Sequence, residues 1–240
     1  MAGVSGGLPA VPIVALDFSD CAEALELVDH LGDRCRFYKI GSELFTRNGP
    51  KCVAEVVDRG CDVFLDLKFH DIPNTVAKGA RSAARLGVRL LTVHASGGRA
   101  MLEAARDGAA DGGDCGVLAV TVLTSLDAPA LAAAWGREHV DVRQEVLRLA
   151  GTAADAGLHG IVCSGQEAAA VRAAHGDRLA LLVPGIRLAG GATQDQARVV
   201  TPRAAVESGA RYLVLGRAVT AADDPRAAME RVLDELRAHD

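Results

Sequence analysis

The sequence predicts an α/β protein that folds as a single (β/α)8 barrel, the TIM barrel. Short apolar runs and helix-like segments alternate along the 240 residues, which is the pattern of parallel βαβ units. There are eight runs of each kind, a number that favours a closed barrel over an open doubly wound sheet. No segment rich in Gly, Ser or Pro divides the chain, so residues 1–240 are expected to form one domain, with 1–10 as a flexible lead.

The predicted elements follow from hydrophobic periodicity. The strands are short aliphatic runs, and the helices are longer, alanine-rich segments with apolar residues on one face. In chain order, the strand and helix pairs are 11–17 and 22–31, 36–41 and 50–59, 62–68 and 75–86, 90–96 and 99–110, 117–125 and 143–156, 160–164 and 167–175, 179–187 and 202–208, and 212–219 and 225–238. Two long insertions, 126–139 and 188–194, follow the fifth and seventh strands, and both are expected on the catalytic face; the second resembles a mobile loop.

Composition excludes several classes of protein. The net charge of -5 and an aromatic content of 3% argue against a nucleic-acid partner. No basic flank of a signal peptide and no apolar run of about 20 residues is present, which predicts a soluble, cytoplasmic protein without a membrane anchor. The six cysteines form no CxxC pair, so they are interpreted as small buried hydrophobes in a reducing cytosol rather than as zinc ligands.

Charged residues gather at the ends of the first three predicted strands. Asp17 ends the first strand, Lys39 lies near the end of the second, and Asp66 and Lys68 end the third, where they share one face; Asp71 follows in the loop. Burying one ion costs several kcal/mol, so charges at this spacing indicate chemistry rather than stability. In such barrels, the carboxyl ends of the strands form the active site.

The last two strands carry a signal for phosphate binding. The seventh ends in Pro184-Gly185-Ile186-Arg187 and the eighth is followed by Gly216-Arg217. Glycine lets an anion approach the backbone, and arginine offers a two-pronged donor. Loops after strands seven and eight are the usual phosphate site of this architecture.

Together, several motifs resemble the bacterial-type orotidine 5'-phosphate decarboxylase family, in order from residue 11 to about residue 225. The motifs are Ala15-Leu16-Asp17, Tyr38-Lys39-Ile40-Gly41, the decapeptide 66–75, His94-Ala95-Ser96-Gly97-Gly98, Thr121-Val122-Leu123-Thr124-Ser125, Pro184-Gly185-Ile186-Arg187 and Gly216-Arg217. The decapeptide is the most specific of them.

The resemblance implies a role for each matching residue. Lys39, Asp66, Lys68 and Asp71 would surround the C6 carboxylate of the substrate, and Lys68 would protonate C6 as carbon dioxide leaves. The remaining substrate contacts that it implies are Asp17 and Lys39 at the ribose, Thr75 from a neighbouring subunit, Thr124 and Ser125 at the pyrimidine, and Arg187, Gln196, Gly216 and Arg217 at the phosphate. It further implies a homodimer in which Asp71 enters the partner's site, with no metal and no cofactor.

Two other functions stay open at this stage. Sugar-phosphate relatives, the keto-gulonate phosphate decarboxylases and hexulose phosphate synthases, share the D-x-K-x-x-D pattern but use Mg²⁺ to stabilise an enediolate. Phe69-His70 within the motif and the Thr124-Ser125 pair weigh against them. A non-catalytic nucleotide-binding barrel is the second alternative, although no charged member of the array is missing.

Other polar residues have simpler explanations. His70 is out of phase with Lys68 and is expected outside the barrel, whereas His94 is expected at the rim, supporting the lysines. Trp135 and His139 are expected to pack locally within their insertion. The segment 111–114, Asp-Gly-Gly-Asp, resembles a turn more than a metal site.

Overall fold

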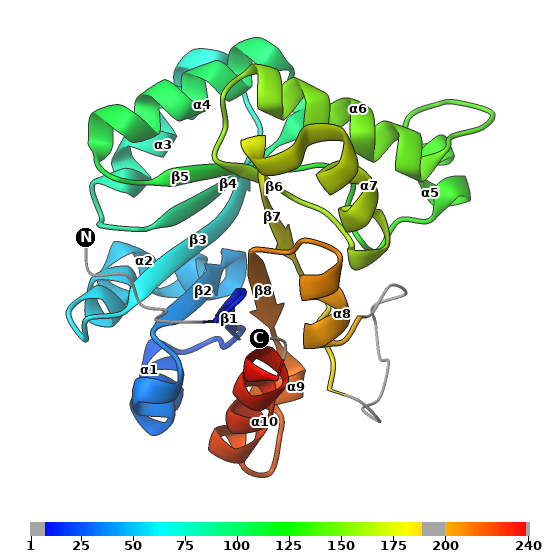
Figure 1. Cartoon of the computed structure of the whole chain (residues 1–240). Helices are drawn as coiled ribbons and strands as arrows, with labels where there is room; N and C mark the ends of the chain where they lie inside the picture. Colours follow the sequence, from blue (N-terminus) through cyan, green and yellow to red (C-terminus); the bar gives the residue numbers. More distant parts are fainter. Residues whose placement is uncertain (1–7, 189–199, 239–240) are drawn as a thin grey trace.

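The strands of the described part of the chain pair in sequence order, each parallel to the next, and the last pairs with the first to close a barrel (Figure 1). This confirms the predicted fold class. The computed structural model describes residues 8–188 and 200–238. The strands are β1 Val11–Leu16, β2 Phe37–Gly41, β3 Asp62–Phe69, β4 Leu90–His94, β5 Gly116–Val120, β6 Gly160–Val162, β7 Ala180–Val183 and β8 Tyr212–Leu215.

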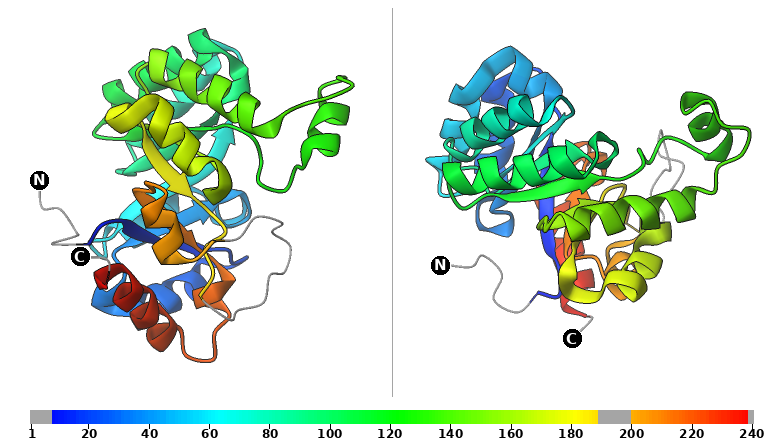
Figure 2. Two further views of the ribbon diagram at one scale, coloured as in Figure 1. Left: turned by 45° about the vertical axis from the view of Figure 1, so that its right-hand side comes forward. Right: turned by 90° about the horizontal axis from the view of Figure 1, so that it is seen from above.

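Helices cover the outside of the barrel (Figures 1 and 2). They are α1 Cys21–Leu31, α2 Ser42–Val57, α3 Pro73–Ala84, α4 Arg99–Gly112, α5 Ala128–Ala134, α6 Val142–Asp155, α7 Gly165–His175, α8 Pro202–Glu207, α9 Arg217–Thr220 and α10 Pro225–Arg237. Polar N-caps explain several of the starts: a side-chain oxygen accepts a backbone N–H at Asp20, Asp127, Asp141, Ser164, Thr201 and Asp224. Proline also lies within the first two residues of α3, α5, α8 and α10, where its missing N–H has no cost.

Some predicted boundaries are wrong. The segment 212–219 was expected to be one strand, but β8 stops at Leu215 and the chain turns at Gly216 into the short helix α9. A short apolar run cannot be divided by periodicity alone, because it fits a buried strand and a buried helical turn equally well. The predicted helix 50–59 is only the second half of α2, which is interrupted at Gly49 with a φ of 65°.

Two apolar layers hold the barrel together. The barrel interior is filled by apolar side chains from the strands, namely Ile13, Ala15, Phe37, Phe64, Leu90, Leu118, Leu182, Tyr212 and Val214. A second and larger cluster lies between the strands and the surrounding helices. The interior is therefore a packed core, which leaves the carboxyl ends of the strands as the place for a site.

The cysteines differ from the prediction. Cys21 at the start of α1 and Cys52 in α2 form a disulfide, with their Cα atoms 5.9 Å apart. The interpretation of all six as small buried hydrophobes in a reducing cytosol is therefore wrong for these two. Their separation of 31 residues gives no hint that the two helices lie side by side. Cys35, Cys61 and Cys163 are buried thiols, as expected, whereas Cys115 is only half-buried.

Of the two predicted insertions, the structure describes the first in full and only one residue of the second. The first, 126–139, contains α5 and projects away from the barrel (Figure 2); Trp135 within it packs against the core cluster. Of the second, 188–194, only Leu188 lies within the described residues. Of the predicted lead, residues 1–7 lie outside them, whereas Ala10 is buried in the core. No helix in the described ranges has the length and apolar character needed to cross a bilayer.

Candidate active site

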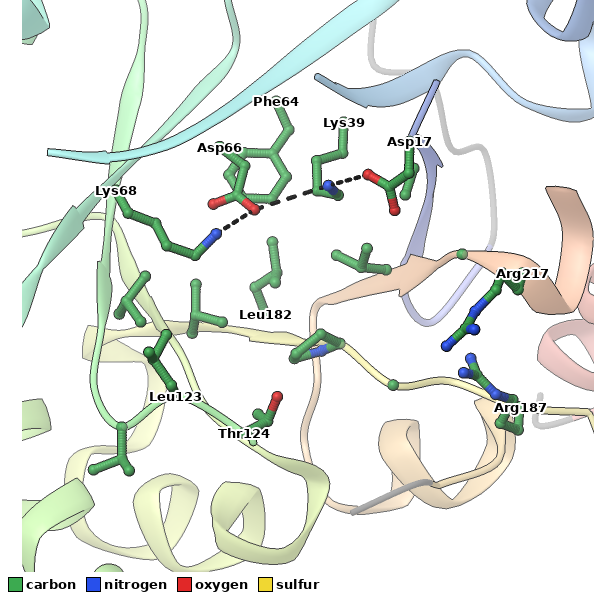
Figure 3. Close-up of a pocket in the computed structure, with 18 residues that line it drawn as sticks. Asp17, Lys39, Phe64, Asp66, Lys68, Leu123, Thr124, Leu182, Arg187 and Arg217 are labelled. Atoms are coloured by element: carbon green, nitrogen blue, oxygen red, sulfur yellow. Dashed lines mark hydrogen bonds and ion pairs between the residues drawn. The ribbon is translucent and has the colours of Figure 1, made fainter. Parts of the chain in front are cut away.

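Four charged side chains form a row across the carboxyl ends of β1, β2 and β3 (Figure 3). The Nζ atom of Lys39 lies 2.8 Å from Oδ1 of Asp17 and 3.9 Å from Oδ2 of Asp66. The same Oδ2 atom accepts a hydrogen bond of 2.8 Å from Nζ of Lys68. Charges therefore alternate along the row, with Asp66 shared between two ammonium groups.

The row is partly withdrawn from water. The side chains of Lys39 and Asp66 are each 13% exposed, compared with 36% for Lys68 and 62% for Asp17. Partial burial strengthens the attraction between the ions, because fewer water dipoles screen it. Lys68 has the more exposed side chain of the two lysines, so its ammonium group is the better placed to contact a ligand.

The end of β3 is distorted where the row is built. Leu65 pairs with Leu91 and Phe69 pairs with Val93, so residues 66–68 bulge opposite the single residue Thr92. Lys68 has a φ of 51°, and among the described residues it is the one non-glycine residue with a positive φ. A left-handed backbone costs a residue with a side chain about 1–2 kcal/mol, and strain of this kind is typical of functional sites.

Thr92 forms hydrogen bonds with the distorted end of β3. Its hydroxyl accepts the backbone N–H of Lys68 at 2.9 Å and donates to Oδ1 of Asp66 at 2.8 Å. The residue is completely buried on β4. Its neighbours in the strand, apart from His94 at the end, are aliphatic.

Gly41 gives the row its space. A β-carbon at this position would lie 3.2 Å from Nζ of Lys39 and 3.7 Å from Oδ1 of Asp17. The first of these distances is tighter than an ordinary van der Waals contact, so any side chain at position 41 would push against the Lys39–Asp17 ion pair. The glycine in Tyr38-Lys39-Ile40-Gly41 is thus explained by close approach.

A cavity of about 290 Å³ opens beside the row. It is lined by Ala15, Asp17, Lys39, Phe64, Asp66, Lys68, Val120, Val122, Leu123, Thr124, Val162, Leu182, Pro184, Gly185, Arg187, Val214, Gly216 and Arg217. Arg187 and Arg217 lie together at the end of the cavity away from Lys68 (Figure 3). The cavity therefore joins a row of alternating charges to a doubly cationic end across an apolar floor that includes Phe64 and Leu182.

Two histidines lie next to the row without lining the cavity. The rings of His70 and His94 are 5.5 Å apart. Burial lowers the pKa of His94, and the charges of His70 and Lys68 lower it further. His70 is exposed, at the residue that follows β3. No group of three or more His, Cys, Asp or Glu side chains within residues 8–188 and 200–238 is arranged to hold a metal ion.

Residues 11–232 match the family described as orotidine 5'-phosphate decarboxylase / HUMPS. The chain belongs to this family. It is 50% identical over 231 residues to a protein of Halorhodospira halophila named orotidine 5'-phosphate decarboxylase, and the match covers 94% of this chain and 95% of the relative. A protein of the same name from Chromobacterium violaceum is 49% identical over 93% of this chain and 90% of its own.

A solved structure agrees with this family membership. The crystal structure of orotidine 5'-phosphate decarboxylase from Lactobacillus acidophilus superimposes with a TM-score of 0.85 at 36% identity. The superposition covers 95% of this chain and 99% of the other. The similarity therefore extends over the whole barrel.

Most of the site residues predicted from the sequence line this cavity. Of the predicted site residues, the cavity is lined by Asp17, Lys39, Asp66, Lys68, Thr124, Arg187, Gly216 and Arg217. Asp71, Thr75 and Ser125 are exposed and do not line it. Gln196 lies outside the described residues. The carboxylate of Asp71 accepts the N–H of Ile72 at 2.6 Å instead of approaching Lys68.

Sequence reasoning missed Thr92. The signal that could have revealed it is a polar residue in the middle of the otherwise apolar run 90–93. A buried hydroxyl needs partners, and the strand-end charges on β3 are its neighbours. The sequence alone could not separate this role from an ordinary place in a strand, because threonine is common in strands.

Proposed function

We propose that this protein decarboxylates orotidine 5'-phosphate to UMP and carbon dioxide, the final step of UMP synthesis. The observation that carries the proposal is the Lys39–Asp66–Lys68 row, which shares one cavity with Arg187 and Arg217. A substrate with a carboxylate at one end and a phosphate at the other matches this distribution of charge. Membership of the decarboxylase family supports the same assignment.

The chemistry at the row centres on Lys68. As the bond between C6 and the carboxylate carbon breaks, carbon dioxide leaves and an electron pair remains on C6 in an orbital that the pyrimidine π-system cannot absorb. A proton from Nζ of Lys68 then forms the new C6–H bond, and the neutral amine regains its proton from water. A carboxylate 2.8 Å away favours the protonated amine beforehand, and Asp66 supplies it.

Fixed charges take the place of a cofactor in this proposal. The developing charge at C6 meets an ammonium group that is already oriented, so little reorganisation is needed during the reaction. Asp66 also faces the leaving carboxylate and repels it, which favours the departure of neutral carbon dioxide. Lys39, held between Asp17 and Asp66, offsets the repulsion between the two carboxylates and is available to the ribose hydroxyls.

The two arginines hold the phosphate in this proposal. A guanidinium group forms paired, charge-assisted hydrogen bonds with phosphate oxygens. Gly216 has open space on the side where a β-carbon would stand, so a ligand can approach its backbone. Thr124 and Ser125 are proposed at the pyrimidine edge, and Gln196, beyond the described residues, at the phosphate.

A homodimer with shared sites completes the proposal. Asp71 and Thr75 are exposed and do not line the cavity of their own subunit, and Ile72 between them is 66% exposed. An apolar side chain so exposed, next to an exposed carboxylate, is consistent with a surface that a second subunit covers. Asp71 would then stand beside Lys68 of the partner subunit.

The first experiment follows the loss of ultraviolet absorbance of orotidine 5'-phosphate with purified protein, before and after treatment with EDTA. Equal turnover in both samples supports the proposal. A strict requirement for Mg²⁺, together with turnover of a hexulose or keto-gulonate phosphate, would favour the sugar-phosphate relatives. Binding of UMP without any turnover would indicate a nucleotide-binding barrel.

The second experiment tests the shared site by mixing two inactive variants, Lys68→Ala and Asp71→Ala. In a mixed dimer, one site carries both defects and the other carries neither. Random exchange of subunits should therefore restore about a quarter of the sites. No recovery after exchange has been verified by mass spectrometry would assign Asp71 to its own subunit.

A further inference from the structure

The hydroxyl group of Thr92 connects the two charged residues of β3. It accepts the backbone N–H of Lys68 and donates to Oδ1 of Asp66, at 2.9 and 2.8 Å. One oxygen atom thus contacts the main chain of the proton donor and the side chain of its counter-ion. Thr92 does not line the cavity, so it acts on a substrate only through these two residues.

The strand ladder leaves this part of β3 without its usual support. Regular pairing with β4 ends at Leu65 and resumes at Phe69, so residues 66–68 are not held by the ladder on that side, although Asp66 still pairs with Gly41 of β2. The N–H of Lys68 still needs a partner, because an unpaired backbone donor away from water is unfavourable. The Thr92 hydroxyl provides that partner at the residue whose backbone is left-handed.

The hydroxyl also decides how the Asp66 carboxylate is turned. With Oδ1 fixed by Thr92, the other oxygen, Oδ2, is the one that faces both ammonium groups, 2.8 Å from Lys68 and 3.9 Å from Lys39. A carboxylate on a free torsion rotates easily, since its χ2 angle has a broad energy well. The hydrogen bond from Thr92 removes that freedom.

We propose that Thr92 is a positioning residue, whose hydroxyl locks the Asp66 carboxylate and the left-handed Lys68 backbone so that the ammonium of Lys68 points at the reacting carbon. The inference rests on the proposed decarboxylase function. Thr92 does not contact the substrate in this proposal. It orients the Asp66 carboxylate and the Lys68 ammonium, which do.

The test compares Thr92→Val, which keeps the shape and removes the hydroxyl, with Thr92→Ser, which keeps the hydroxyl. Misdirected catalytic groups cost up to about 100-fold in rate, so Thr92→Val should lower kcat about 10- to 100-fold and change KM less than about 3-fold. Thr92→Ser should stay within about 3-fold of the parent protein in kcat. Affinity for UMP, measured by calorimetry, should be the same in all three.

Thr121→Val is the matched control. Thr121 is also a buried threonine that does not line the cavity, and its hydroxyl donates to the carbonyl of Val162 at 2.8 Å rather than to a charged side chain of the row. This variant should lose stability as Thr92→Val does but keep its kcat. If Thr92→Val does not fold, Thr92→Ala replaces it in the same comparison with Thr92→Ser.

Hydrogen exchange of the Lys68 amide, followed by NMR, separates this inference from the proposed function. Protection should be lost in Thr92→Val and kept in Thr92→Ser. A parent protein that does not decarboxylate orotidine 5'-phosphate refutes the function, and the amide data then decide the positional claim alone. The inference is overturned if Thr92→Val keeps its kcat, if folded Thr92→Ser is as slow as Thr92→Val, or if the amide is equally protected in all three.

Discussion

Replacing Asp66 with asparagine should reveal how much the alternating row contributes to catalysis. The substitution keeps the size of the side chain and removes one negative charge from between two ammonium groups. At an effective dielectric constant of about 20, the Coulomb attraction between Asp66 and Lys68, 2.8 Å apart, is about 6 kcal/mol. The attraction between Asp66 and Lys39, 3.9 Å apart, is about 4 kcal/mol, and the cost of desolvation must be subtracted from both values.

The net effect is smaller than this sum. Lys68 keeps 36% of its side chain exposed, so water screens part of its interaction with Asp66. A net loss of about 3–4 kcal/mol of transition-state stabilisation is reasonable for a preorganised ionic site, which corresponds to a fall of about 100- to 1,000-fold in kcat/KM. Initial rates from the ultraviolet assay would measure it.

Asp62→Asn is the matched control for this prediction. Asp62 begins the same strand at the opposite end of the barrel and does not line the cavity, so neutralising it removes no charge from the row. Its kcat/KM should stay within about 2-fold of the parent value. If Asp66→Asn retained activity to the same extent as Asp62→Asn, the electrostatic account of the row would be refuted.

Three further predictions concern the phosphate end, the pH dependence and the disulfide. Arg217→Ala should raise KM and lower kcat/KM by about 10- to 100-fold in the same assay, because contacts to a remote phosphate also organise the charged centre; unchanged kinetics would remove Arg217 from the phosphate site. Burial lowers the folded-state pKa of His94 and His159 below their value of 6.5 in the unfolded chain, so each binds its proton more readily when unfolded. Their contribution to stability is complete above pH 6.5 and is lost as the pH falls through the folded pKa values, by at most about 1.4 kcal/mol per pH unit for each group. Urea unfolding at pH 7.5 and 5.5 would measure this, and a His94→Gln, His159→Gln variant with the same slope would contradict it. Reduction of the Cys21–Cys52 bond, which closes a loop with a sequence separation of 31, should lower the free energy of unfolding by up to about 3–4 kcal/mol; an unchanged urea midpoint after complete thiol labelling would disprove that.

The barrel and much of its site could be predicted because both depend on local patterns. Alternation of apolar runs and helical segments specifies βα units, and parallel strands necessarily gather their carboxyl ends at one rim. Asp17, Lys39, Asp66 and Lys68 could therefore be assigned to a common site without knowing any distance. The glycine–arginine pairs after the last two strands followed the same logic.

The features that could not be predicted all depend on contacts between distant segments. Neither the bulge at residues 66–68 nor the partner it finds in Thr92 leaves a periodic signal in the sequence. The pairing of Cys21 with Cys52 depends on how α1 and α2 pack against each other. Gly41 could be recognised as part of a motif, but its reason, the nearby Nζ of Lys39, needed the fold.

The bulge in β3 also has a consequence for protein engineering. On an undistorted strand, two residues separated by one other lie about 6.6 Å apart along the chain. A lysine at the second of these positions would populate many rotamers, and few of them would bring its amine to the aspartate. Grafting an Asp-x-Lys triplet onto a regular strand of another scaffold would transfer the residues and lose the fixed direction of the amine. A successful transplant would have to carry three further parts: the irregular register, the left-handed residue and a buried hydroxyl on the adjacent strand.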